Sequence, residues 1–249
     1  MRQLVGPVDP IYFDNPSRRL VYPQVPERAY ERVFDFGCGC GRVARQLIQQ
    51  RVRPRRYLGI DLHPGMITWC RENLSPATTG FEFHHHNVWN YHFNPSADAT
   101  MLPFPTDETF TLVNAISVFT HLPQAEAEHY LREVRRIVDG EGFIVWTWLL
   151  FDKREFPFLH ETHNALYASH ADPGAAVVFD REWLERQLDA LGLAIIDVVP
   201  PHIRGYNWIL TSTPRSAGVK PLEIPPDTAP IGTVTLPQMP ENPGRIGLS

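Results

Sequence analysis

The sequence predicts an α/β fold in which a mostly parallel sheet carries helices on both faces. Residues 33–48 combine a short apolar run, three alternate glycines and then apolar residues at helical spacing, which indicates a strand, a tight turn and a helix. Strand and helix patterns continue to alternate along residues 56–134. Residues 143–151 are almost uniformly apolar, as expected of a strand that is covered on both sides.

Each element has its own sequence signal. Strands are expected over residues 33–36, 56–61, 81–88, 111–118, 143–151, 193–199 and 207–213, the last two as an antiparallel hairpin. Helices are expected over residues 41–51, 64–74, 123–140 and 180–190. His63 and Pro64 are typical of a helix start, and acids early and arginines late in the third helix complement its dipole.

The length of 249 residues fits one domain over residues 30–213, flanked by two appendages. Residues 1–29, rich in proline and aromatic side chains, form an arm that either closes over a ligand as a lid or packs on the surface. Residues 152–178 form an insertion that lies over the carboxyl edge of the sheet and covers a substrate. Prolines exclude regular structure from the tail, residues 214–249, which wraps the domain, contacts a second subunit or stays mobile.

Composition excludes several classes of protein. A net charge of −5 and a pI near 6.1 give no basic footprint for nucleic acid. Three cysteines are too few and too unevenly spaced for a disulfide framework, which indicates a reducing compartment. No apolar run approaches the roughly 20 residues that span a bilayer, and the first residues lack a secretory signal. We expect a soluble cytoplasmic protein without nucleic-acid or membrane partners, with a homodimer as the open alternative to a monomer.

The glycine turn carries the most specific signal. It reads Asp35-x-Gly37-x-Gly39-x-Gly41, and Arg42 stands where a dinucleotide-binding turn would need a further glycine. An acid just before the turn repels a pyrophosphate and attracts a ligand that carries an ammonium and a sulfonium. The stretch resembles motif I of the class I S-adenosylmethionine-dependent methyltransferases.

Further segments resemble this family in the expected order: 56–61, 102–122 and 130–142. The first of them ends in Asp61, about 20 residues beyond the glycines, where a ribose would be held. The resemblance covers residues 30–213 and implies a Rossmann-like sheet of seven strands with an antiparallel last strand. It also implies S-adenosylmethionine as the methyl donor.

The resemblance assigns roles around the donor. The glycines let the backbone lie along the methionine portion, Asp35 attracts its amine directly or through water, and Asp61 holds the ribose hydroxyls. Leu62 and Met66 flank the adenine, and Asn87 accepts its amino group. The alternative for Asp61 is a helix-capping acid. The full expected set is Asp35, Gly37, Cys38, Gly39, Gly41, Arg42, Asp61, Leu62, Met66, Asn87, Val88 and Ser117.

His121 is the candidate general base. It follows the strand at 111–118 by a few residues and should stand at the carboxyl edge of the sheet, and an imidazole can accept a proton near neutral pH. The alternative is a histidine that caps the helix starting at Pro123 or lines the pocket inertly. A second catalytic device would be a divalent ion such as Mg²⁺, with Asp152, His160, His163 and His121 as ligands, although no motif spacing supports it.

The acceptor is predicted from fewer residues. Residues 117–120 read Ser-Val-Phe-Thr, whereas methylases of exocyclic amines carry Asn/Asp-Pro-Pro-Tyr/Phe there, which argues against such substrates. Trp146 and Trp148 share one side of their strand and either stack on a sugar or belong to the core. The residues expected to contact the acceptor are Trp148, Asp152, His160 and His163.

The chain is similar to bacterial O-methyltransferases of glycan biosynthesis, the methylmannose and methylglucose polysaccharide type above all. We therefore expect methyl transfer to a hydroxyl of a small acceptor, foremost a saccharide. Two alternatives stay open, namely another natural-product or lipid acceptor, and a non-catalytic module that only binds S-adenosylmethionine. Intact motif residues from Asp35 to Asp61 weigh against the non-catalytic reading.

Overall fold

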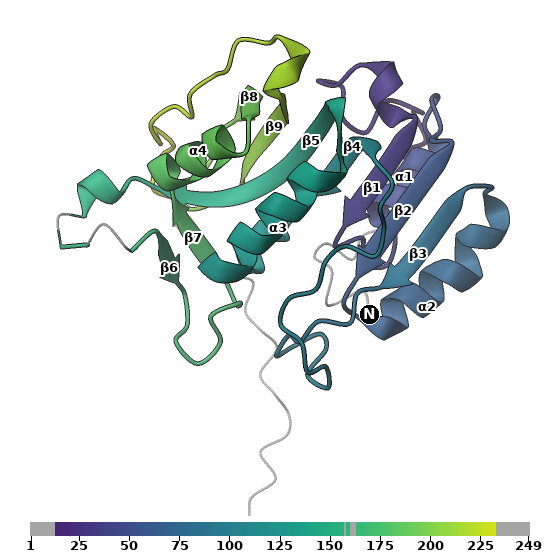
Figure 1. Ribbon diagram of the computed structural model, residues 1–249, viewed down its shortest axis with the longest axis horizontal. Helices are drawn as coiled ribbons and strands as arrows, with labels where there is room; N and C mark the ends of the chain where they lie inside the picture. Colours follow the sequence, from purple (N-terminus) through teal and green to yellow (C-terminus); the bar gives the residue numbers. More distant parts are fainter. Residues whose placement is uncertain (1–12, 157, 160–162, 233–249) are drawn as a thin grey trace, which may run out of the picture.

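The computed structural model describes residues 13–156, 158–159 and 163–232, which form one sheet flanked by helices (Figure 1). The strands are β1 Arg32–Phe36, β2 Arg56–Asp61, β3 Phe81–His85, β4 Phe110–Ala115, β5 Val138–Phe151, β6 Ala165–Tyr167, β7 Val177–Asp180, β8 Leu193–Val199 and β9 Trp208–Pro214. The α-helices are α1 Arg42–Gln49, α2 Pro64–Asn73, α3 Gln124–Ile137 and α4 Arg181–Ala190. Short 3₁₀ turns are η3 Glu27–Tyr30, η4 Ser75–Ala77, η5 Phe119–His121, η6 Lys153–Glu155 and η7 Arg215–Ala217.

The sheet is mostly parallel, as predicted. Strands β3, β2, β1, β4 and β5 lie side by side in this order, and all four pairings between them are parallel. Beyond β5, the last strand β9 runs antiparallel to both β5 and β8, so the predicted antiparallel hairpin is confirmed. The order of the strands reverses between β1 and β4, and ligands of open α/β sheets bind at the carboxyl ends of the strands at such a point.

The sheet has nine strands instead of the expected seven because the 152–178 insertion adds to it. Strand β5 is 14 residues long and extends past β9, which pairs with it only as far as Trp148. The remaining edge, from Leu149 to Phe151, pairs in parallel with β7, and β6 pairs antiparallel with β7. Part of the predicted cover is therefore an extension of the sheet itself.

Alternating side chains divide the core into two layers. Phe34 and Phe36 of β1 face a cluster that contains the buried sides of α3 and α4. Val33, on the opposite face of β1, packs in a second cluster with α1, α2 and the 3₁₀ turn η3. Neighbouring strand residues point to opposite faces, so both layers follow directly from the apolar runs in the sequence.

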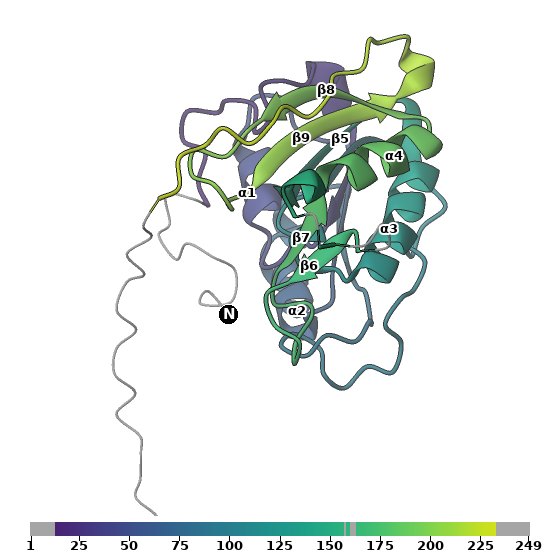
Figure 2. The same cartoon turned by 90° about the vertical axis from the view of Figure 1, so that its left-hand side faces the viewer.

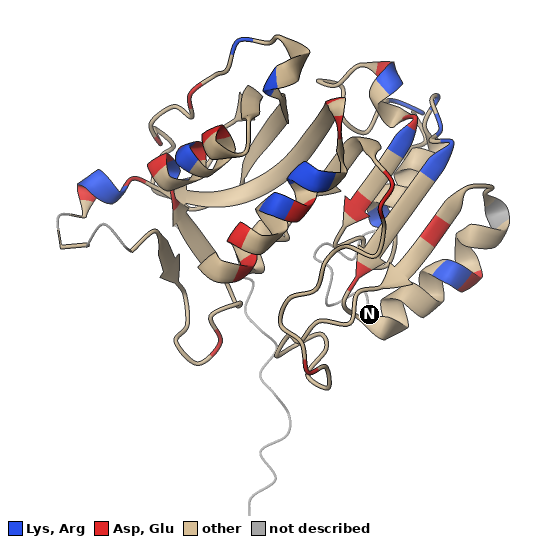
Figure 3. Ribbon diagram, in the orientation of Figure 1, with Lys and Arg blue, Asp and Glu red and all other residues tan. Residues whose placement is uncertain are grey.

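The third helix, α3, has 14 residues and is the longest in the described chain. Figure 3 shows acidic residues at its start and basic residues toward its end, the order that stabilises a helix dipole. In the part of the chain that the structure describes, no helix combines the length and the apolar character needed to cross a bilayer.

The two appendages pack against opposite parts of the domain. In the arm, Asp14 accepts hydrogen bonds from Arg45 and Gln49 of α1, so residues 13–30 lie on the α1 side of the sheet. The first 12 residues, part of the predicted lid, lie outside the described chain. The described part of the tail runs along β8 (Figure 2), where the Leu222 amide donates to the Ile195 carbonyl at 2.8 Å.

Candidate active site

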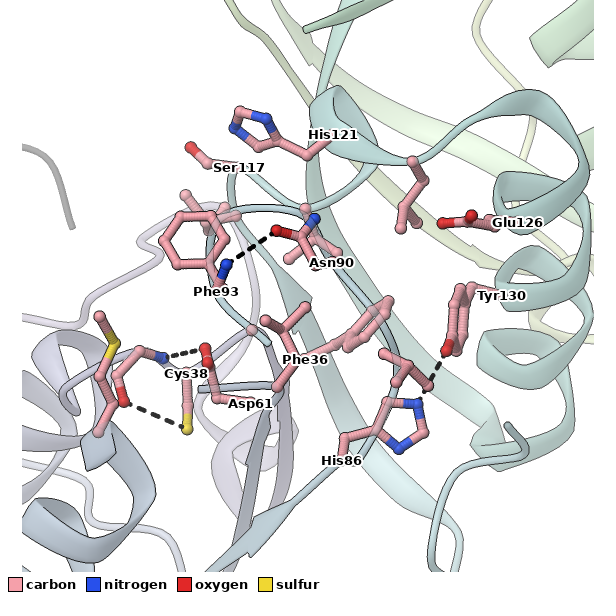
Figure 4. A pocket seen from close by; sticks show the side chains of 18 of the residues that line it. Phe36, Cys38, Asp61, His86, Asn90, Phe93, Ser117, His121, Glu126 and Tyr130 are labelled. Atoms are coloured by element: carbon pink, nitrogen blue, oxygen red, sulfur yellow. Dashed lines mark hydrogen bonds between the residues drawn. The ribbon is translucent and has the colours of Figure 1, made fainter. Parts of the chain in front are cut away.

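A cavity of about 410 Å³ opens at the carboxyl ends of β1, β2 and β4, beside α3 (Figure 4). This volume lies within the range of pockets that bind small molecules. Ten of the predicted site residues line it, namely Gly37, Cys38, Gly39, Arg42, Asp61, Leu62, Met66, Val88, Ser117 and His121. The predicted residues that do not line it are Asp35, Gly41, Asn87, Trp148, Asp152 and His163.

The turn after β1 requires glycine at two positions. Gly37 has a φ of +75°, and a Cβ added there would lie 2.5 Å from Cγ2 of Val118. Gly41 has a φ of +76°, and its Cβ would lie 2.3 Å from Cδ1 of Leu74. The backbone amides of Gly37 and Cys38 both donate to the carbonyl of Ile60, which ties the turn to β2. Bare backbone therefore forms one wall of the cavity.

Asp61, at the end of β2, has unused hydrogen-bonding capacity at this wall. Its Oδ2 accepts from the Gly39 amide and its Oδ1 from the His63 amide, both at 2.8 Å. A carboxylate offers about four acceptor positions, so roughly two remain for hydroxyl groups of a ligand. Burial raises the pKa of Asp61, and the two amides partly oppose this. The cap of α2 is His63, whose Nδ1 accepts from the Met66 amide, so the capping role proposed as an alternative for Asp61 is filled.

Leu62, Met66 and Val88 supply apolar surface next to Asp61. Asn87 is exposed and does not line the cavity, and its Oδ1 accepts from Nδ2 of Asn94 in the same loop at 3.0 Å. Asn90 lines the cavity instead, and its Oδ1 accepts from the Phe93 amide at 3.1 Å (Figure 4).

Asp35 lies beneath the glycine turn and is 1% exposed. Its two oxygens accept hydrogen bonds from the hydroxyl of Tyr57 and from Nδ2 of Asn114, each at 2.5 Å. The hydroxyl of Tyr22 in the arm donates to Oδ1 of Asn114 and completes the cluster. Burial raises the pKa of Asp35 to about 6 against the lowering effect of the two hydrogen bonds. This carboxyl supports the turn from below and makes no direct contact with the cavity.

Arg42 provides positive charge at the glycine end. It lines the cavity and forms no ion pair with any residue that the structure describes. A guanidinium there suits a ligand carboxylate, because its planar donors match two carboxylate oxygens. Ser117 lines the cavity with a φ of +57°, an uncommon conformation for a residue with a side chain, and its amide donates to Oγ1 of Thr147 at 2.7 Å.

His121 stands at the rim, at the end of η5, which follows β4 (Figure 4). Its Nδ1 lies 3.0 Å from the carbonyl oxygen of Gly174. A carbonyl only accepts, so Nδ1 carries the hydrogen and the neutral ring keeps an acceptor lone pair on Nε2. This tautomer is the one that a general base at Nε2 requires.

Residues 172–174 of the 152–178 insertion contact the loops at the cavity rim. Asp172 lies 2.6 Å from Nε2 of His92, in the loop that carries Asn90, and Gly174 contacts His121. The insertion therefore joins the two loops at the cavity rim. Of the residues predicted to bind an acceptor, Asp152 and His163 lie elsewhere in the insertion and do not line the cavity. Trp148 lies in β5, and His160 lies outside the described chain.

Trp148 and Asp152 have structural partners. Trp148 is fully buried, and its ring stacks on Phe119 with centroids 4.4 Å apart, so it belongs to the core. Asp152 pairs with Arg154 and Arg181 at 2.8 and 2.7 Å, and these guanidiniums lower its pKa to about 2. Its oxygens are committed to cations, which does not fit a magnesium ligand. Within the described residues, no three His, Cys, Asp or Glu side chains are placed to share a metal ion.

The residues that form the far wall of the cavity were not predicted from the sequence. Glu126 and Tyr130 of α3 line it, and the Tyr130 hydroxyl lies 2.8 Å from Nε2 of the buried His86 (Figure 4). Trp89 and Phe93 line the rim next to Asn90. Aromatic residues in an otherwise polar loop were a usable signal for the rim. The sequence gives no comparable signal for Glu126, because an acid in the first turn of a helix is also explained by its favourable interaction with the helix dipole.

Comparisons with known proteins find similarity to methyltransferases. Residues 33–142 match the family model described as "Methyltransferase domain". The malonyl-[acyl-carrier protein] O-methyltransferase of Bacteroides fragilis (strain 638R) is 29% identical over 129 residues, 51% of this chain; the chain spans only 22% of that relative.

Two solved structures show the same fold. An S-adenosylmethionine-dependent methyltransferase from Clostridium acetobutylicum superposes with a TM-score of 0.51 at 11% identity, over 78% of this chain and 94% of its own. The second is an O-methyltransferase from neocarzinostatin biosynthesis, in complex with S-adenosyl-L-homocysteine and 1,4-dihydroxy-2-naphthoic acid. It superposes with a TM-score of 0.50 at 13% identity, over 77% of this chain and 52% of its own.

Proposed function

We propose that this chain transfers the methyl group of S-adenosylmethionine to a hydroxyl oxygen of a small acceptor, and that the acceptor is a saccharide. The match of residues 33–142 to a methyltransferase domain supports the expected enzyme class, a methyltransferase that uses S-adenosylmethionine. The oxygen acceptor and the saccharide class are what the proposal adds.

The observation that carries the proposal is the geometry of Asp61 at the glycine turn. Its carboxylate is held by two backbone amides and keeps acceptor positions for a pair of ribose hydroxyls. On one side lie Leu62 and Met66, which suit an adenine face, and on the other lies Arg42, which suits the methionine carboxylate. These groups together match an adenosine joined to an amino acid, and the residues present fit the donor.

The chemistry assigned to the chain is orientation and proton removal. Bound S-adenosylmethionine supplies an activated methyl group as a sulfonium. His121 accepts the proton of the acceptor hydroxyl at Nε2, while its Nδ1–H stays bonded to the Gly174 carbonyl, which fixes the ring. The cavity holds the acceptor oxygen in line with the methyl group, and this positioning supplies a large part of the rate increase.

The support for a saccharide now comes from the cavity rim. Trp89 is 43% exposed there and offers an apolar face of the kind that stacks on a sugar ring, with Phe93 beside it. Trp148, the residue first assigned this role, is fully buried. Other hydroxyl acceptors, natural products and lipids among them, are the competing class.

Two measurements test the proposal. Isothermal calorimetry should show binding of S-adenosylmethionine and S-adenosylhomocysteine, without competition by NAD. Incubation with methyl-labelled donor and fractionated cell extract should place the label in an alkali-stable ether on a saccharide. An absence of donor binding would overturn the donor site, and label on nitrogen or in an alkali-labile ester would overturn the hydroxyl acceptor.

A further inference from the structure

The two ends of the cavity differ in charge. Arg42 lies at the glycine end, whereas residues 72–131, which supply the far wall and much of the rim, contain no lysine or arginine and seven acids. Figure 3 shows no basic residue on the first turns of α3 or on the loop after β3.

Glu126 is the carboxyl that this end presents to a ligand. It lies in the first turn of α3 and lines the cavity, half-buried, and it makes no hydrogen bond or ion pair with the described residues (Figure 4). One turn further on, the Tyr130 hydroxyl is already engaged by His86. Burial raises the pKa of Glu126 to about 7. A half-buried carboxyl without a partner is stabilised when a ligand donates a hydrogen bond to it.

Charge decides which ligands gain from this wall. A hydroxyl or an ammonium donates to the carboxylate, and a charge-assisted hydrogen bond is about twice as strong as a neutral one. A carboxylate or phosphate placed there would face Glu126 with no arginine or lysine to offset the repulsion, which is stronger in a half-buried site than in water. A sulfonium bound at the glycine end favours the ionised form of Glu126, because an opposite charge nearby lowers the pKa of an acid.

We propose that Glu126 is a specificity-determining residue that binds a second hydrogen-bond donor of the acceptor while His121 takes the proton of the reacting hydroxyl. The site then selects uncharged or cationic polyhydroxyl acceptors and rejects acceptors that carry a carboxylate near the reacting oxygen. This inference rests on the proposed function and narrows its acceptor class.

Three probes on one scaffold test the inference: methyl glucoside, the cationic methyl glucosaminide and the anionic methyl glucuronide. Release of S-adenosylhomocysteine is followed at a pH above the pKa of Glu126, with the wild type and Glu126→Gln. In the wild type, we expect kcat/KM for the glucuronide to lie at least about tenfold below that for the glucoside. This is the reduction expected from the loss of one charge-assisted contact. In Glu126→Gln, the ratio of kcat/KM for the glucoside to that for the glucuronide should be about tenfold smaller than in the wild type. The change should lie in KM, while kcat stays within about twofold of the wild-type value.

Glu128→Gln is the matched control, because Glu128 lies on the same turn, accepts from Gln124 at 2.9 Å and does not line the cavity. Its charge preference should equal that of the wild type. Glu126→Asp keeps the charge and should still reject the glucuronide. This variant provides the test if Glu126→Gln fails to fold.

Equal use of the three probes by the wild type, or an unchanged ratio in Glu126→Gln, would overturn the inference. A loss confined to kcat would overturn it as well, since it would make Glu126 part of proton transfer. Turnover of none of the probes would overturn the polyhydroxyl class. Binding of S-adenosylhomocysteine by calorimetry, measured on the same preparation, tells whether the proposed donor site has failed too.

Discussion

The glycine end and the far end of the cavity are built in different ways. At the glycine end, the turn after β1 and the end of β2 present backbone and one carboxylate, and amide hydrogen bonds to Ile60 and Asp61 hold the wall in place. At the far end, side chains from η5, α3 and the loop after β3 line the cavity, and the insertion contributes the backbone carbonyl of Gly174, which lies against His121. The first end depends on two adjacent strands, and the second on segments up to about 90 residues apart in the sequence.

This difference separates the two expected roles. A wall of backbone is hard to alter by substitution and suits a ligand that never changes, as a methyl donor would be. A wall of side chains on loops can be replaced residue by residue and suits a variable acceptor. Substitutions at the glycine end should therefore change donor affinity or stability, and those at the far end should change turnover or acceptor choice.

The largest effect is expected at the far end. His121→Ala should lower kcat by about 10²–10⁴ with donor affinity unchanged, because the imidazole would remove the acceptor's proton and would touch neither the ribose nor the methionine portion. Steady-state kinetics with labelled donor measure both quantities. His84→Ala, in the solvent-facing part of β3, is the control. A variant with wild-type turnover at saturating donor and acceptor would remove His121 from the mechanism.

The next effect concerns the carboxyl beneath the glycine turn. Burial raises the pKa of Asp35 from 3.8 to about 6 in the folded protein, so between these values the native state binds the extra proton. Stability is then highest below the lower value and falls by about 3 kcal/mol as the pH rises through about 6, at ~1.4 kcal/mol per unit. Asp35→Asn should lack this fall. Urea unfolding at several pH values measures it, and parallel curves for the two proteins would contradict the prediction.

Donor affinity should respond most to Asp61. Asp61→Ala should weaken binding of S-adenosylhomocysteine by roughly 1.5–3 kcal/mol, the cost of losing hydrogen bonds to a charged group. The Gly39 amide also loses its acceptor, so a small loss of stability should accompany the change. Calorimetry compares the variant with Asp107→Ala, whose side chain is fully exposed. Unchanged affinity would mean that the ribose is held elsewhere and would break the contrast between the two ends.

The smallest effect is expected for the arm. Tyr22→Phe removes the hydroxyl that donates to Asn114 and leaves a buried acceptor unpaired, at a cost of about 1 kcal/mol or somewhat more in stability. Donor affinity should not change, because Tyr22 lies below the turn and not in the cavity. Tyr91→Phe, at an exposed position, should have no effect in the same unfolding experiment. A loss of donor affinity with unchanged stability would instead assign the arm to the ligand site.

The sequence by itself determined the order of strands and helices, the glycine turn and the position of Asp61. These features follow from contacts within a few residues or from periodic burial, as with the alternation of Val33 and Phe34 between the two core layers. The insertion was predicted to be a cover, and its strands β6 and β7 were missed, because short strands form only where a long neighbour such as β5 offers a free edge.

Only the tertiary structure decided which side chains face the cavity. Asp35, one residue before the end of β1, and Asp61, the last residue of β2, both lie next to the glycine turn. Tyr57 and Asn114 bury the first, yet the second stays open to a ligand. Trp148 has the pattern of an aromatic platform and is covered by Phe119, whereas Glu126 has the pattern of a dipole partner and lines the far wall. The physical reason is that burial and hydrogen-bond partners come from residues distant in the chain, so local sequence carries no record of them.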